Sequence, residues 1–247
     1  MKAILYTFFV LTVVSCSSST SDFKSQTTGD PQEDTVAKSQ LPSGLCIWKE
    51  VAVRETPSEK GKYLTSVSLG EKFEVSADTA SETVNGKKSV YHLIKLSDGT
   101  TGWVRETFIA INAKAGAFTQ DAVLYKRPDL MTASKKSFNY LDFVAIKGSN
   151  NDGWSEVIGK RKGDTWFSTG WVRTETLTTL EVDVHFSALY NVIMEIPEEV
   201  QRQEELDKLF LSDMLAESVF HQQNGDNAED FVETEYSEEP DTTTVNQ

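Results

Sequence analysis

The middle of the sequence contains a duplicated segment, and this duplication limits the fold more than any other feature. Residues 101–107 (TGWVRET) recur as residues 169–175 (TGWVRTE), an offset of 68 residues. Two more pairs of segments match upstream, at offsets of 71 and 70: 51–57 with 122–128, and 71–75 with 141–145. Offsets that drift by a few residues indicate loop insertions between two copies of one unit. The sequence therefore predicts two similar small domains in tandem.

Each copy has the pattern of antiparallel β-strands. In the first copy, residues 90–96 (VYHLIKL) alternate in polarity and are followed by Ser97-Asp98-Gly99, and Asp-Gly between two such runs is a strong hairpin signal. In the second copy, residues 154–158 lead into a longer basic loop at 159–164 (GKRKGD), and residues 166–172 form the return strand. We expect each copy to be a β-domain built from hairpins.

The order of these segments resembles the order of motifs in a known protein family. A strand that ends in Arg54-x-x-Pro57 precedes Gly-Glu-x-Phe-x-Val at 70–75 and then Asp-Gly-x-x-Gly-Trp-Val at 98–104. This order is similar to that of the bacterial SH3-like domain, SH3b. The second copy departs from the pattern, because residues 125–127 (YKR) stand where the first copy has Arg-Glu-Thr and its central hairpin is longer.

The resemblance implies two small β-barrels of about five short strands each, which close their sheets and hide the edges. We place them at residues 44–112 and 116–180. The expected fold class is mainly β: two SH3-like barrels in tandem, a helical C-terminal arm at residues 185–221, and a disordered acidic tail at residues 222–247.

The N-terminus has the features of an export signal. Lys2 precedes a stretch of apolar and small residues at 3–15, which has the length of a signal-peptide core and is too short to span a bilayer. Val13-Val14-Ser15-Cys16 resembles a bacterial lipobox. The resemblance implies a lipoprotein signal peptide at 1–15, cleavage before Cys16, and lipid attachment to its thiol. The alternative is an ordinary secretory signal with an incidental cysteine.

Residues 16–43 are rich in Ser, Thr, Gln and Asp and contain few side chains that could be buried, so we expect a flexible tether. In a host that sorts lipoproteins by the residue after the cysteine, Ser17 instead of aspartate favours the outer membrane. The chain is thus expected in the cell envelope, lipid-anchored through Cys16 to the outer membrane, facing the periplasm or the surface.

Acidic residues are concentrated at the C-terminal end. The chain has 38 Asp and Glu against 24 Lys and Arg, a formal net charge of −14. Residues 181–247 hold 18 of the acidic residues and only two of the basic ones. Such a block repels polyphosphate, so no nucleic-acid partner is expected there. Residues 222–247 contain eight acidic and no basic side chains, which indicates disorder.

The predicted helical arm has apolar residues at steps of three to four, and Pro197-Glu198-Glu199 is typical of a helix start. Its apolar stripe must be buried against something. It can pack on the barrels, or it can dock on a partner of the chain. Both alternatives remain open from the sequence.

Aromatic and basic residues of the second copy are the candidate ligand-binding residues. Trp154 and Trp166 flank the cations Lys160, Arg161 and Lys162, and such a set suits stacking on sugar faces and pairing with carboxylates. The alternative is a cross-strand aromatic pair that stabilises the hairpin. Trp103 and Trp171, at the Gly-Trp-Val positions, either line a binding groove or close the barrel cores.

The sequence does not predict an enzyme. A wall-peptide cysteine hydrolase needs a cysteine nucleophile, a histidine base and a group that orients the histidine. With Cys16 acylated only Cys46 remains, and its apolar neighbours predict a buried, inert thiol. The three histidines, His92, His185 and His221, occur singly. We expect no catalytic residues, no cofactor and no metal site.

The SH3b resemblance implies an accessory module. The expected function is non-catalytic binding of a cell-wall peptide or glycan (peptidoglycan), or of an envelope protein, by the tandem SH3b modules of a membrane-anchored lipoprotein. The alternative is a structural adaptor whose C-terminal amphipathic helix and acidic tail dock an envelope partner.

Overall fold

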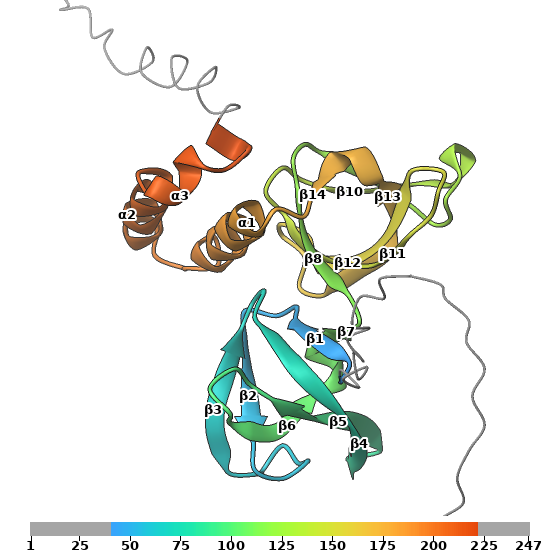
Figure 1. The fold of residues 1–247 in the computed structure, drawn as a ribbon, viewed down its shortest axis with the longest axis vertical. Helices are drawn as coiled ribbons and strands as arrows, with labels where there is room; N and C mark the ends of the chain where they lie inside the picture. The colour runs from blue at the N-terminus through green and yellow to red at the C-terminus, as the bar shows by residue number, and fades with distance from the viewer. Residues whose placement is uncertain (1–40, 222–247) are drawn as a thin grey trace, which may run out of the picture. The chain divides into compact units, whose positions relative to one another are not determined.

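The computed structural model describes residues 41–221 (Figure 1). The predicted signal peptide with Cys16, most of the predicted tether and the acidic tail lie outside the described residues. Residues 41–221 form two seven-stranded antiparallel sheets followed by three α-helices. The fold is therefore mainly β, with its helices at the C-terminal end.

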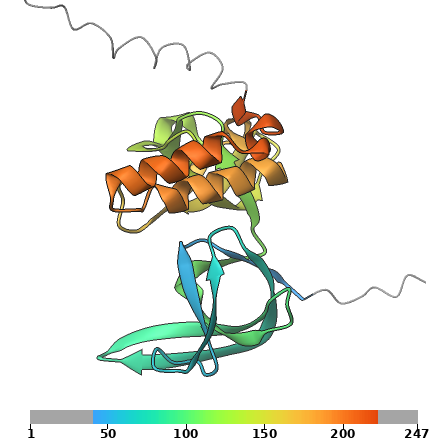
Figure 2. The same cartoon turned by 90° about the vertical axis from the view of Figure 1, so that its left-hand side faces the viewer.

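The first sheet, here called the first β-domain, spans residues 43–111 and curls on itself (Figure 1). Its strands are β1 (Ser43–Cys46), β2 (Glu50–Arg54), β3 (Tyr63–Ser68), β4 (Lys72–Val84), β5 (Lys87–Lys95), β6 (Thr101–Arg105) and β7 (Ile109–Ile111), with a 3-10 turn η1 (Glu106–Phe108). The strand order is β3-β2-β6-β5-β4-β1-β7. The β4–β5 hairpin extends beyond the rest of the sheet (Figure 2), and its turn residues Asn85 and Gly86 both have positive φ, as an Asn-Gly turn of type I′ requires.

The second sheet, the second β-domain, spans residues 114–178. Its strands are β8 (Lys114–Phe118), β9 (Ala122–Tyr125), β10 (Ala133–Phe138), β11 (Phe143–Ser149), β12 (Trp154–Lys160), β13 (Phe167–Arg173) and β14 (Leu177–Thr178), with 3-10 turns η2 (Leu130–Thr132) and η3 (Thr174–Thr176). Their order, β10-β9-β13-β12-β11-β8-β14, matches the first sheet position by position. The predicted duplication is confirmed: the two copies are tandem small β-domains with one topology.

Each sheet has more strands than the five or so that the family resemblance implied. After η1 in the first β-domain and η3 in the second, the chain forms a short last strand that pairs with the first strand of the same domain. Ile111 of β7 lies opposite Gly44 of β1, and Leu177 of β14 lies opposite Phe118 of β8. This pairing occupies the outer edge of the first strand, which otherwise would present unpaired backbone groups.

The glycine of each Gly-Trp-Val segment is required by close strand packing. A Cβ atom on Gly102 of β6 would lie 2.6 Å from Cγ1 of Val53 and 2.9 Å from the carbonyl oxygen of Arg54. At the equivalent position in β13, a Cβ atom on Gly170 would lie 2.6 Å from the carbonyl oxygen of Tyr125. The repeated motif thus marks the point where β6 and β13 pass closest to β2 and β9.

Alternating apolar residues of the strands fill each β-domain. The first core includes Val51, Val53, Val67, Phe73, Val75, Ile94 and Val104. The second includes Phe118, Leu124, Phe138, Val144, Val157 and Val172. In the second core, the rings of Phe118 and Phe138 stack with centroids 4.9 Å apart.

The helices are α1 (Glu181–Ile193), α2 (Glu199–Phe210) and α3 (Asp213–Ala216), and α1 and α2 lie side by side (Figures 1 and 2). Their apolar stripe packs within the chain, in a cluster that includes Leu141, Phe186, Leu209 and Phe220. Polar contacts fix α1 as well, because Ser187 Oγ and Asn191 Nδ2 donate to the carbonyl oxygen of Leu141 at 2.8 and 2.7 Å. Within residues 41–221, no helix is long and apolar enough to cross a bilayer.

Candidate functional site

Four aromatic side chains from both β-domains form one cluster, here called the aromatic cluster: Trp48, Phe108, Trp166 and Phe167. Trp48 follows β1, and Phe108 ends η1. Trp166 directly precedes β13, and Phe167 is its first residue. Their ring centroids are 5.2 to 6.2 Å apart, in tilted or edge-to-face arrangements. Such geometries are favourable for aromatic rings. Trp166 is 52% exposed, so its ring is accessible to a ligand.

Lys160 joins the aromatic cluster to a neighbouring pocket. Its ammonium lies 5.1 Å from the ring centroid of Trp48, which is within the range of a cation–π interaction. The same ammonium forms an ion pair with Glu195, just beyond the end of α1. The side chain is thereby held between the aromatic cluster and the helix.

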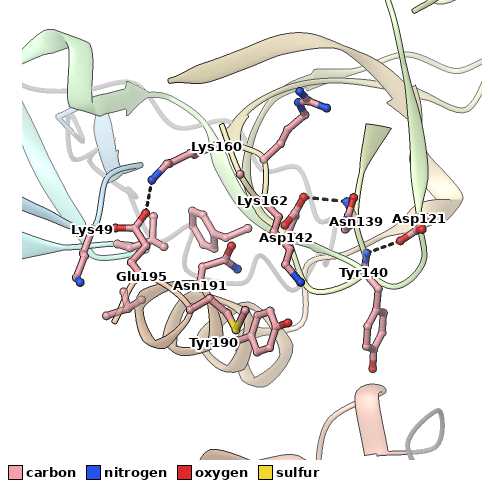
Figure 3. A pocket seen from close by; sticks show the side chains of 16 residues that line it. Lys49, Asp121, Asn139, Tyr140, Asp142, Lys160, Lys162, Tyr190, Asn191 and Glu195 are labelled. Carbon is pink, nitrogen blue, oxygen red and sulfur yellow. Dashed lines mark hydrogen bonds and ion pairs between the residues drawn. The ribbon is translucent and has the colours of Figure 1, made fainter. Parts of the chain in front are cut away.

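The pocket beside Lys160, here called the α1 pocket, has a volume of about 490 Å³ (Figure 3). It is formed by the β8–β9 and β10–β11 turns, the β12–β13 loop, the C-terminal end of α1, and two residues of the first β-domain. Its lining residues are Lys49, Leu69, Asp121, Asn139, Tyr140, Asp142, Phe143, Lys160, Arg161, Lys162, Gly163, Tyr190, Asn191, Val192, Met194 and Glu195. The volume lies within the usual range for small-molecule sites.

Four cations line the α1 pocket, and two of them are free to meet an anionic ligand. Arg161 is engaged by Asp164 through two hydrogen bonds of 2.9 Å and by the carbonyl oxygen of Ser137 at 3.1 Å, and Lys160 is paired with Glu195. Lys49 and Lys162 form no ion pair with any residue of the described chain. Their ammonium groups are the available positive charge of the pocket.

A buried carboxyl group, that of Asp142, lines the same pocket next to Lys162 (Figure 3). Its Oδ2 accepts a hydrogen bond of 2.8 Å from the backbone N–H of Asn139. Asp142 is only 2% exposed, and this burial raises its pKa to about 6, against the lowering effect of backbone hydrogen bonds from Asn139 and Lys162 and of the Arg161 and Lys162 charges. The pocket thus contains two ammonium groups without an ion pair among the described residues and a carboxyl group whose pKa is raised by burial.

Tyr140 contributes to the fold more than to the pocket. Figure 3 shows its phenol pointing away from Asp142. The ring meets Phe220 edge-on, with centroids 5.4 Å apart. Its buried hydroxyl has no hydrogen-bond partner among the described residues, and burial raises its pKa to about 12. It is a neutral, structural side chain at physiological pH.

A second hollow also borders the aromatic cluster. It has a volume of about 190 Å³ and shares Trp48 and Phe108 with the cluster. Its charged lining residues include Arg54, Glu59 and Arg105, and the guanidinium of Arg105 lies 6.0 Å from the ring centroid of Phe108. The aromatic cluster therefore has charged residues in two neighbouring hollows.

The structure brings some of the predicted site residues together and separates others. Trp166 lies in the aromatic cluster, and the three cations Lys160, Arg161 and Lys162 line the α1 pocket. Trp154 lies elsewhere: it is 5% exposed, and its ring meets Tyr125 edge-on at 4.9 Å. The two tryptophans are not cross-strand partners, because Trp154 lies opposite Arg173, whose guanidinium is 4.9 Å from the indole centroid.

The tryptophans of the Gly-Trp-Val segments are half-buried strand residues outside both features. Trp103 lies opposite Arg54, and Trp171 lies opposite Tyr125. Neither residue lines the α1 pocket or belongs to the aromatic cluster. Their neighbours in the strands, Gly102 with Val104 and Gly170 with Val172, are buried, so by strand alternation both tryptophans lie on the outward face of their sheets.

Several site residues were not found from the sequence, namely Trp48, Phe108, Asp142, Asn191 and Glu195. Only Asp142 carried a signal, since it is an acidic residue inside the apolar run 141–146. The other four come from segments distant in sequence, and no local pattern predicts that they meet.

Cys46 is fully buried, as its apolar neighbours predicted. Burial raises the pKa of its thiol to about 12, and Sγ donates a hydrogen bond of 3.2 Å to the carbonyl oxygen of Trp48. In the described part of the chain, no group of three or more His, Cys, Asp or Glu side chains is placed to hold a metal ion.

Comparisons with known proteins give limited similarity. No protein-family model and no curated protein matches the chain. Among solved structures it is similar to NlpC1 from Trichomonas vaginalis, at 12% identity and a TM-score of 0.24 over 57% of this chain and 47% of NlpC1. It is also similar to NlpC2 from the same organism, at 12% identity and a TM-score of 0.24 over 62% of this chain and 56% of NlpC2. The chain thus spans about half the length of these structures. Its own fold is that of a mainly β protein with two tandem β-domains.

Proposed function

We propose that this chain is an envelope lipoprotein whose tandem SH3b-like domains bind a cell-wall peptide or glycan, without catalysis, at the surface formed by the aromatic cluster and the α1 pocket. A protein segment of the same chemistry is the other ligand that this surface would accept. The observation that carries the proposal is the exposed ring of Trp166, which packs on Trp48 and Phe167, in an aromatic cluster that Lys160 joins to the α1 pocket.

The chemistry of the surface suits a ligand with an apolar face and carboxylates. An exposed indole held by other rings can stack on the face of a sugar or on an apolar side chain. The ammonium groups of Lys49 and Lys162 can pair with ligand carboxylates in a pocket that partly excludes water. The amide of Asn191, already fixed by the Leu141 carbonyl, can hydrogen-bond a ligand amide.

Two features support binding without catalysis. The thiol of Cys46 is buried, and its raised pKa keeps it protonated, so it is a poor nucleophile. The charged groups of the site are also largely engaged in holding its shape, as the pairs Arg161–Asp164 and Lys160–Glu195 illustrate. This arrangement is that of a preformed binding surface.

Anchoring in the envelope is supported by the resemblance of residues 13–16 to a lipobox. Its test is metabolic labelling with palmitate and membrane fractionation of the full-length chain and of Cys16→Ser. We expect label on the native chain only. Label on neither protein would contradict lipid anchoring and leave the binding proposal to be tested on a secreted protein.

Wall binding is tested by sedimentation with purified peptidoglycan. We expect Trp166→Ala and Lys162→Glu each to weaken binding about tenfold, the loss of one well-placed aromatic or charged contact. The matched control is Tyr63→Ala, because Tyr63 on β3 is 55% exposed and lies outside the site. A native chain that stays in the supernatant while a wall-binding control protein sediments would exclude the wall ligand.

The adaptor function is a second proposal, and it is favoured by two exposed apolar residues near the ends of α2. Val200 is 74% exposed and Leu211 is 85% exposed. They lie in a strongly acidic stretch, which suits a basic partner. The test is envelope cross-linking with the double variant Val200→Ser/Leu211→Ser. Deletion of the whole arm is unsuitable, because it would remove Phe186 and Leu209 from the core cluster.

A further inference from the structure

The tip of the β9–β10 hairpin exposes two large apolar side chains. Leu130 is 65% exposed and Met131 is 90% exposed, and both belong to the 3-10 turn η2. The tip projects from the rim of the second sheet and is the green turn to the right of the label β13 in Figure 1. Two adjacent exposed apolar residues of this size on a projecting turn are a candidate contact surface, because their burial on a partner would remove apolar area from water.

The tip is ordered by its own hydrogen bonds. Asp129 caps the turn, since its Oδ1 accepts from the backbone N–H of Met131 at 2.9 Å. Thr132 Oγ1 contacts the carbonyl oxygens of Arg127 and Asp129 at 2.9 and 2.8 Å, and the backbone N–H of Lys126 donates to the carbonyl oxygen of Thr132 at 3.1 Å. The two apolar side chains are therefore presented on a fixed turn, which lowers the entropy cost of docking.

Four exposed cations flank the apolar pair. They are Lys126, Arg127, Lys135 and Lys136. None of them forms an ion pair with another residue of the described chain. The only acidic residue between them, Asp129, is engaged as the cap of η2. The tip thus combines a protruding apolar pair with unneutralised positive charge.

We propose that this hairpin tip docks on an anionic lipid bilayer, with Leu130 and Met131 in the interfacial region and the four cations at the lipid phosphates. Interfacial binding takes this combination of apolar side chains and cations, and long basic side chains can reach headgroups while the apolar tip lies deeper. The repulsion of like charges disfavours pairing of two such tips. The proposal depends neither on acylation of Cys16 nor on the wall ligand, and a bilayer contact at this tip would hold the second β-domain at the membrane surface.

The exposed apolar residues of α2 provide an internal contrast. Val200 and Leu211 are as exposed as the pair on η2. Their neighbours Glu198, Glu199 and Asp213 are acidic, however, and would be repelled by an anionic bilayer. Exposure alone therefore does not define the docking surface; the cations around η2 do.

The experiment uses residues 40–247, whose described part, residues 41–221, contains all four core clusters, from Leu45 to Phe220. This chain lacks the apolar segment 3–15, which would bind lipid by itself. Co-sedimentation is measured with vesicles of phosphatidylcholine alone and of phosphatidylcholine mixed with phosphatidylglycerol. We expect binding to the mixed vesicles, weakened by added salt, and little binding to the neutral ones.

Two double variants test the apolar pair and the cations of the tip separately. Leu130→Ser/Met131→Ser should weaken binding to mixed vesicles at least tenfold, because it removes the apolar contact. Lys135→Glu/Lys136→Glu should weaken it at least twentyfold, since each cation near an anionic surface contributes about fivefold. The matched controls are Val200→Ser/Leu211→Ser for exposed apolar area and Lys87→Glu/Lys88→Glu, on the β4–β5 hairpin, for net charge. Both controls should bind like the native chain.

A fluorescence measurement reports insertion directly. Met131→Cys in residues 40–247 places one accessible thiol on the tip, because Cys46 is fully buried. A nitrobenzoxadiazole label at this position should shift its emission to shorter wavelength on mixed vesicles, whereas the same label at Leu211→Cys should not. No vesicle binding would overturn the proposal. Binding that depends on the cations but leaves the label in water, with Leu130→Ser/Met131→Ser unaffected, would also overturn it, because it would indicate electrostatic adsorption to the vesicle surface without insertion.

Discussion

The ammonium of Lys160, at the end of β12 in the second β-domain, lies 5.1 Å from the ring centroid of Trp48, which follows β1 in the first β-domain. The same ammonium is paired with Glu195 beyond the end of α1. One side chain therefore ties together the two copies of the duplicated unit and the helical arm. The exposed Trp166 ring rests on this arrangement, since it packs on Trp48 with centroids 5.7 Å apart.

The first prediction concerns stability at this contact. Lys160→Gln removes the cation from Trp48 and from Glu195 and should lower the free energy of unfolding by about 1 kcal/mol, the scale of a partly buried cation–π contact. Urea unfolding followed by tryptophan fluorescence measures the change. The control is Lys147→Gln, whose pair with Glu156 is more exposed and should contribute less than about 0.5 kcal/mol. An equal decrease in the free energy of unfolding in both variants would show that the contact of Lys160 with Trp48 adds no stability beyond that of an exposed ion pair.

The second prediction concerns the pH dependence of stability at Asp142. Burial raises its pKa in the folded chain to about 6, above the ordinary value of 3.8. Between these values the folded chain binds more protons than the unfolded chain, so this carboxyl must lower stability as pH rises from 4 to 6. The penalty is then fully present above pH 6 and is absent below pH 4.

Asp142→Asn cannot ionise but keeps an oxygen for the Asn139 N–H. It should be more stable than the native chain at pH 7.5, by up to about 3 kcal/mol for a shift of this size. The advantage should shrink through pH 6 and disappear near pH 4. Urea unfolding of both proteins at several pH values measures it, and a difference that stays constant with pH would show that Asp142 does not titrate in this range.

The repeat could be predicted from the sequence because its signals are local. The segments that match at offsets of 68 to 71 residues lie on equivalent strands, β2 with β9, β4 with β11, and β6 with β13. The helical spacing after residue 185 likewise indicated α1 and α2, although α1 begins earlier, at Glu181. Alternation and helical periodicity depend on residues that are close in sequence, and the structure has strands and helices at the segments that show them.

The candidate site could be predicted only in part, because it depends on contacts between distant segments. The basic run 160–162 and the exposed Trp166 were found because they stand together in one loop. Trp48 and Phe108 belong to the first copy, and nothing in their own segments predicts a contact with Trp166. The burial of Trp154 was also beyond the sequence, because Tyr125 and Arg173 cover it only after β9 and β13 are in place.

The third prediction tests the close approach at the Gly-Trp-Val segments. Gly102→Ala and Gly170→Ala each place a Cβ atom 2.6 Å from another heavy atom, and in both cases a backbone oxygen is within 3 Å. Because a backbone oxygen cannot move aside without disturbing the sheet, we expect a loss of about 2 to 3 kcal/mol in each variant. Gly148→Ala is the control, since nothing lies within 4 Å of its Cβ position. A thermal unfolding temperature unchanged in Gly102→Ala would show that β6 has room to shift away from β2.

The last prediction concerns the attachment of the end of the helical arm to the second β-domain. Asp183, in the first turn of α1, is fully buried. Its carboxylate accepts hydrogen bonds from Thr178 Oγ1 and Ser218 Oγ, both at 2.6 Å, and from the backbone N–H of Val219 at 3.0 Å. One side chain thus connects β14, α1 and the segment that follows α3.

Asp183→Ala leaves these three donors without their acceptor and should lower the free energy of unfolding by about 3 to 5 kcal/mol. Hydrogen exchange at the Val219 amide should accelerate in the same variant, because the end of the arm loses its attachment. The matched control is Glu181→Ala, in the same turn of α1, whose exposed pair with Lys72 at 3.6 Å should contribute less than about 0.5 kcal/mol. Similar stability of the two variants would mean that the apolar contacts of Phe186 and Phe220 hold the arm without the Asp183 carboxylate.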